Sequence, residues 1–300
     1  MIFLALFRFD GAAFDPANQD DSLSLVRHFQ PRSRPLGPGF HEAGFEPVQG
    51  ETISLMGGTE VFQMQDSGHF ERSLHRNFPE HSLKVRNLGW PADTVFRQQR
   101  PMYFYTDVGD SQQGSIPDSR KKVTPGTFIL QFGKMESLDG IEALESFTTS
   151  YGKLLTELLK ISGRIILVQP SPFPEDGPAG SLAAERNSVL EDYREAIRKL
   201  ATKHRVISVE SFDDLSARVD SDTEGSSLQR AILRKNKLWD QYYRPTNWAF
   251  LFGDRQHVPS SRDHRDANRR WFVEEIEKIP PLIAAEEAVI RDLAKGGENE

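Results

Sequence analysis

The chain has 300 residues, of which 37% are hydrophobic and none is cysteine, and its formal net charge is -7. The missing cysteines exclude disulfides, thiolate zinc sites and cysteine nucleophiles. The negative charge argues against non-specific nucleic-acid binding, which requires clustered lysine and arginine. The length is sufficient for one large α/β domain with appendages.

Residues 1–50 are rich in Gly, Pro, Asp and Phe and have no sustained hydrophobic period. We therefore predict an irregular N-terminal arm. The apolar run at 1–7 is too short to span a membrane and has no signal-peptide cleavage pattern. We expect no membrane association and, by default, a cytoplasmic protein.

The first regular elements lie between residues 51 and 96. The apolar run 53–56 predicts a buried parallel strand that ends at Gly-Gly-Thr, residues 57–59. Phe70, Leu74 and Phe78 recur every four residues, which predicts one helix that ends before Pro79. A second strand is expected over 83–88, followed by a turn at 89–94.

Strands and helices continue to alternate after a loop at 97–125. The patterns predict strands at 127–132, 165–168 and 206–209, and helices at 141–161 and 182–203. Right-handed crossovers would then give a parallel sheet covered on both faces, a flavodoxin-like three-layer α/β/α sandwich over 51–227. The tail, 228–300, is expected to form a C-terminal helical extension on this core, interrupted by prolines at 280 and 281.

Four short phrases occur in order: Gly-Gly-Thr at 57–59, Gly-His-Phe-Glu at 68–71, Asn-Phe-Pro-Glu-His at 77–81 and Arg-Asn-Leu-Gly-Trp at 86–90. They resemble the SGNH (GDSL-type) hydrolase family, and in particular a divergent branch in planctomycete and related bacterial proteins. That family begins with a strand ending in Gly-Asp-Ser, a helix, and a strand ending in Asn-x-Gly-x-x-Gly-Asp. The resemblance implies the same sandwich fold and hydrolysis of acyl esters, including those of O-acetylated carbohydrate.

The resemblance places Thr59 at the position of the family's nucleophilic serine. Threonine is a possible nucleophile, although its side chain is stiffer at χ1 than serine. The alternative is that Thr59 serves as the N-cap of the following helix.

The oxyanion positions also differ from the family pattern. Ala92 replaces the glycine whose backbone N–H stabilises the oxyanion, and its own N–H could still serve. Met135 replaces the asparagine of the third block, and methionine has no hydrogen to donate. The catalytic blocks are therefore degenerate, and the activity is expected to be weak or specialised.

The family base, a histidine in an Asp-x-x-His motif, is missing from its usual place, because residues 216–228 contain no histidine. Asp254 and His257 have this spacing later in the chain. They could be a relocated orienter and base, or a structural pair in a charged loop. His69 is a further candidate, expected to point away from Thr59.

The remaining patterns identify no cofactor. Asp263, His264 and Asp266 match no standard metal-ligand spacing and more often form a salt-bridge network. Gly-Gly-Thr at 57–59 has neither the P-loop lysine nor the dinucleotide fingerprint. Two functions stay open: a hydrolase for a small-molecule or carbohydrate ester, and a non-catalytic relative that binds a ligand or partner. The oligomeric state does not follow from the sequence.

Overall fold

The computed structural model describes residues 45–96, 126–215, 225–246, 248–251, 255 and 257–296. Its strands are β1 (Thr52–Gly57), β2 (Lys84–Asn87), β3 (Thr127–Gln131), β4 (Arg164–Val168) and β5 (Ile207–Val209). Its α-helices are α1 (Thr59–Ser67), α2 (His69–Asn77), α4 (Leu144–Leu159), α5 (Ala183–His204), α6 (Ser227–Tyr243), α7 (Trp248–Leu251), α8 (Trp271–Glu277) and α9 (Ile279–Gly296). The predicted arm up to residue 44, the loop 97–125, the segment 216–224 and Asp254 lie outside the described residues.

The five strands form one parallel sheet in the order β2-β1-β3-β4-β5. Ile53 of β1 lies opposite Val85 on one side and Thr127 on the other. This is the flavodoxin-like strand order, in which the chain changes direction across the sheet between β1 and β3. The predicted fold class is therefore confirmed.

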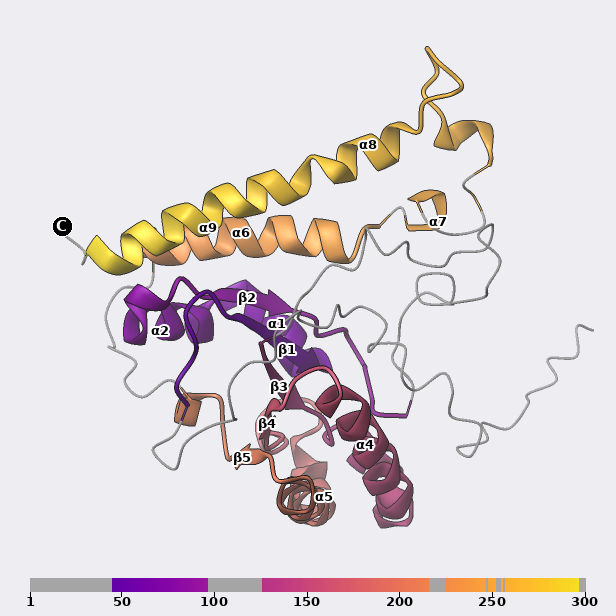
Figure 1. Cartoon of the computed structure of the whole chain (residues 1–300). Coiled ribbons are helices and arrows are strands. Elements are labelled where there is room, and N and C mark those ends of the chain that lie inside the picture. Colours follow the sequence, from indigo (N-terminus) through magenta and orange to yellow (C-terminus); the bar gives the residue numbers. More distant parts are fainter. Residues whose placement is uncertain are drawn as a thin grey trace, which may run out of the picture.

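Both faces of the sheet are covered, as expected for parallel strands with apolar residues on both sides. The face that carries Met56, Phe128 and Leu167 packs against α4 and α5 and against the end of α6. The opposite face, with Ile53 and Ile166, packs against α1 and α2. Figure 1 shows these layers around the sheet.

The helix predicted after β1 is in fact two helices, because Gly68 adopts a left-handed conformation with φ 65° between α1 and α2. A Cβ at Gly68 would lie 2.9 Å from Ile232 Cγ2 of α6. The break thus allows α6 to approach closely. The Phe70 and Leu74 pattern still marks the buried side of α2.

The predicted C-terminal helical extension is present. Figure 1 shows α6 and α9 side by side over α1, α2 and β2, with α8 and α9 forming one nearly continuous rod. Pro280 and Pro281 lie in the first turn of α9, where missing N–H groups cost no intrahelical bond. None of the described helices is long and apolar enough to cross a membrane.

Candidate functional site

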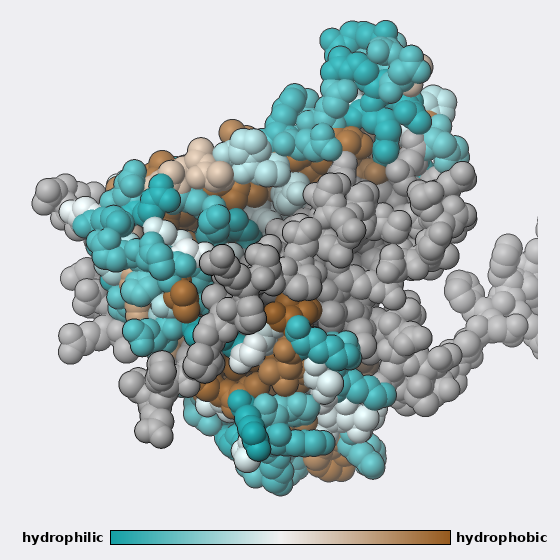
Figure 2. Space-filling view, in the orientation of Figure 1, coloured by the Kyte–Doolittle hydropathy of each residue, from teal (hydrophilic) through white to brown (hydrophobic). Residues whose placement is uncertain are grey.

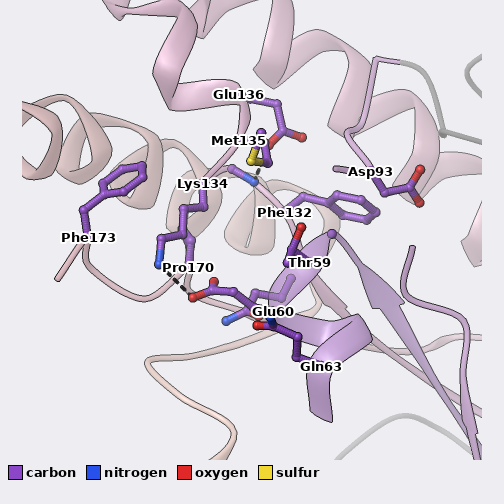
Figure 3. Close-up of a pocket in the computed structure, with 13 residues that line it drawn as sticks. Thr59, Glu60, Gln63, Asp93, Phe132, Lys134, Met135, Glu136, Pro170 and Phe173 are labelled. Carbon is purple, nitrogen blue, oxygen red and sulfur yellow. Dashed lines mark hydrogen bonds and ion pairs between the residues drawn. The ribbon is translucent and has the colours of Figure 1, made fainter. Parts of the chain in front are cut away.

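A cavity of about 330 Å³ opens at the carboxyl ends of β1 and β3, where the strand order changes direction. Open α/β sheets bind ligands at such switch points. The start of α1, the end of β3 and the loops that follow β2, β3 and β4 supply its lining (Figure 3). The lining residues are Gly58, Thr59, Glu60, Gln63, Asp93, Gln131, Phe132, Gly133, Lys134, Met135, Glu136, Pro170 and Phe173.

Close packing at the end of β1 requires its two glycines. A Cβ at Gly57 would lie 2.4 Å from Gln131 O, and one at Gly58 would lie 3.0 Å from Asp93 O. The chain can therefore turn directly from β1 into α1, whose first residue is Thr59. This turn places the Thr59 side chain in the cavity (Figure 3).

Thr59 lies next to Ala92 of the loop that follows β2. The Ala92 N–H donates a hydrogen bond of 3.1 Å to Thr59 Oγ1. Ala92 has φ 58°, in the left-handed region that favours glycine. The N-cap alternative for Thr59 is wrong, because Gly58 is the cap residue and no side chain caps α1.

Met135 and Glu136 differ sharply in their surroundings. Met135 lines the cavity and is 38% exposed, and its thioether donates no hydrogen bond. The Glu136 carboxylate is buried and accepts hydrogen bonds from Val95 N (2.8 Å) and Gly133 N (2.9 Å). Burial raises the pKa of Glu136 to about 7, and Asp93 contributes in the same direction.

A polar cluster not predicted from the sequence borders the cavity. Lys134 Nζ donates to Glu60 Oε1 (2.8 Å), Ser171 Oγ (2.9 Å) and Pro172 O (3.2 Å). Ser171 Oγ also donates to Glu60 Oε1. The cluster connects the start of α1 to the loops after β3 and β4. In the sequence, these residues are marked only by lying a few positions after a predicted strand.

The predicted histidines lie elsewhere. His257 is exposed and lies between α7 and α8. Figure 1 shows this part of the chain beyond the N-terminal end of α8. The described residues that line the cavity include no histidine. His69 Nδ1 lies 3.3 Å from an Arg72 side-chain nitrogen within α2. The structure therefore brings together Thr59, Ala92 and Met135, while the pairing of His257 with Asp254 stays a prediction.

The charged loop before α8 forms a salt-bridge network. Both oxygens of Asp263 contact the Arg265 guanidinium, and Arg269 pairs with Glu274. The arginine hydrogen bonds lower the pKa of Asp263 to about 2. These contacts agree with the structural interpretation of this loop.

Part of the cavity lining that follows β3 is apolar, because Phe132 and Met135 contribute to it. Met135, Leu138 and Ile141 have exposed side chains after this strand. Figure 2 shows hydrophobic residues gathered in the lower middle of the surface in this view, next to hydrophilic residues. The cavity thus offers a bound molecule apolar side chains and the Thr59 hydroxyl group, which accepts a hydrogen bond from the Ala92 amide.

Comparisons with protein families and with curated proteins find no match. Among solved structures, a gut microbial diltiazem-metabolizing enzyme aligns at 14% identity and a TM-score of 0.41, over 55% of this chain and only 37% of that enzyme. An acetylxylan esterase from Geobacillus stearothermophilus aligns at 14% identity and 0.40, over 65% and 95% of the two chains. A lipase/acylhydrolase from Enterococcus faecalis aligns at 16% identity and 0.38, over 57% and 82%. Because these sequence identities and TM-scores are low, the fold assignment rests on the observed order of the strands in the sheet.

Proposed function

We propose that the chain hydrolyses small acyl esters in this cavity, with Thr59 as the nucleophile. The observation that carries the proposal is the 3.1 Å contact between Ala92 N and Thr59 Oγ1 at the switch point. It joins a hydroxyl and a backbone donor, the two groups that acyl transfer needs nearest the reacting carbonyl.

In the proposed reaction, Thr59 Oγ1 attacks the carbonyl carbon of the ester and its proton passes to a base. The Ala92 N–H transfers its hydrogen bond to the developing oxyanion. Collapse of the tetrahedral intermediate releases the alcohol and leaves an acyl-threonine, which water hydrolyses. We assign the base to His257, oriented by Asp254, because the two residues have the Asp-x-x-His spacing of the family motif at a later place in the chain; this requires His257 to approach the cavity.

The proposed enzyme is slow. Met135 stands where the family has a donor asparagine, and losing one such donor costs about 3–4 kcal/mol, or roughly a hundred- to a thousandfold in rate. The apolar part of the lining and the volume of about 330 Å³ suit a short acyl group such as acetyl. We propose O-acetylated carbohydrate as the substrate class on the family resemblance alone.

A second candidate is binding without catalysis. Two observations favour it: no histidine occurs among the described lining residues, and Met135 supplies no donor. In that case Thr59 and Ala92 would contribute only hydrogen-bonding groups for a ligand.

Hydrolysis of p-nitrophenyl acetate separates the two candidates. The hydrolase predicts wild-type turnover above the buffer rate, a loss of at least about a hundredfold in Thr59→Val, and a comparable loss in His257→Ala. Thr202→Val, an exposed threonine on α5, is the matched control and should keep the wild-type rate. Equal rates for all four proteins would leave only the binding candidate.

A further inference from the structure

Arg244 extends from the end of α6 into the core domain. It is the C-cap residue of α6, and its side chain is only 7% exposed. Its guanidinium reaches the loop that follows β2, the same loop that carries Ala92. The C-terminal extension thus contacts a segment that builds the cavity.

All five N–H groups of Arg244 have acceptors. Nε and one terminal nitrogen donate to Gly89 O at 3.0 and 2.5 Å, and the same terminal nitrogen lies 3.1 Å from Asn87 O. The other terminal nitrogen donates to Asp240 Oδ1 (2.6 Å) and Gln65 Oε1 (3.2 Å). A planar guanidinium can satisfy these directions together, whereas the ammonium of lysine cannot.

Three aromatic rings enclose this guanidinium. Its central carbon lies 4.9 Å from the centre of the Phe62 ring, 5.2 Å from that of Tyr243 and 5.9 Å from that of Trp90. These cation–π contacts and the low exposure fix the guanidinium in one place. Arg244 therefore acts as a rigid support for the loop.

The support is transmitted through a single peptide plane. Arg244 binds the carbonyl of Gly89, and the N–H on the other side of the same peptide bond, Trp90 N, donates to Gly57 O at 3.1 Å. Because a peptide unit is planar, these two contacts fix its orientation from both sides. Ala92, two residues further on, then presents its N–H to Thr59 Oγ1.

We propose that Arg244 is a positioning residue for the Ala92 amide, so that the C-terminal extension is required to build the site. The effect of this positioning on catalysis rests on the proposed function, whereas the positioning of the Ala92 N–H does not. Removing the guanidinium frees the Gly89–Trp90 peptide to rotate and moves the Ala92 N–H away from Thr59.

The test is NMR of protein labelled with ¹⁵N-alanine. In Arg244→Lys, the Ala92 amide shifts and exchanges its hydrogen at least tenfold faster, while Ala196 in α5 and Ala231 in α6 keep their signals. Asp240→Asn, which keeps the guanidinium but removes one charged partner, gives a smaller shift of the same amide. The matched control, Arg234→Gln, removes an exposed arginine from the same helix and leaves Ala92 unchanged.

An unchanged Ala92 amide in folded Arg244→Lys overturns the proposal; if that variant does not fold, an unchanged amide in Asp240→Asn does so. On p-nitrophenyl acetate, Arg244→Lys should lower kcat at least tenfold with KM within about twofold. A wild-type protein without esterase activity would refute the proposed function, whereas the amide measurement would still decide the role of Arg244.

Discussion

Ala92 is a non-glycine residue with a left-handed backbone at the point where its N–H must face Thr59. This conformation costs an L-residue roughly 1–2 kcal/mol. We expect Ala92→Gly to raise the free energy of unfolding by about 0.5–1 kcal/mol, since glycine adopts it without strain but loses more entropy on folding. Urea denaturation measures the change.

The matched control is Ala284→Gly, at an exposed position in α9. There the same substitution should destabilise by about 1 kcal/mol, because glycine is a poor helix former. Destabilisation at both positions would contradict the strained backbone at Ala92.

Glu136 makes stability depend on pH. Its pKa rises from 4.5 to about 7 on folding because the carboxyl is buried. The folded state therefore binds the proton more tightly, and this contribution is fully present below about pH 4.5 and is lost as pH rises through 7. Its size is at most about 3 kcal/mol.

Urea denaturation at pH 5 and pH 8 tests this expectation. We expect the free energy of unfolding of the wild type to fall relative to that of Glu136→Gln as pH rises, since glutamine does not titrate. A difference between the two proteins that stays constant with pH would show that Glu136 titrates normally.

At the scale of elements, a buried ion pair joins α6 to α2. Lys235 Nζ lies 2.8 Å from Glu71 and also donates to Val85 O at 3.2 Å, and both charged side chains are almost fully buried. Burial tends to raise the pKa of Glu71, but the contacts with Lys235 and His75 together more than offset this and keep it below its usual value.

Lys235→Met should destabilise the protein by about 3–5 kcal/mol, because it leaves the Glu71 carboxylate buried without its main partner. Lys235→Met combined with Glu71→Leu should recover much of this loss. Arg234 is the neighbour of Lys235 in the chain and forms an exposed ion pair with Glu286. Arg234→Met should lower the free energy of unfolding by less than about 1 kcal/mol. Thermal denaturation compares the three, and equal losses in the two single variants would contradict a buried pair.

At the scale of the whole molecule, hydrophobic periodicity was sufficient to predict the five strands, α4, α5 and the parallel sheet. The break at Gly68 was missed, because the apolar pattern of the helix continues across a glycine whose role depends on α6. Thr59 and Ala92 were singled out by the family resemblance, and the structure places them in hydrogen-bond contact. The Lys134–Glu60–Ser171 cluster and the Arg244 contacts were not, because each depends on loop conformations set by residues far apart in the sequence.

Covalent trapping tests most directly whether Thr59 is the nucleophile. The protein is treated with a fluorophosphonate, which reacts with activated hydroxyl groups, and the modified peptide is identified by mass spectrometry. We expect one adduct, on Thr59, that is absent in Thr59→Val. No adduct, or an adduct on Ser171 in place of Thr59, would contradict it.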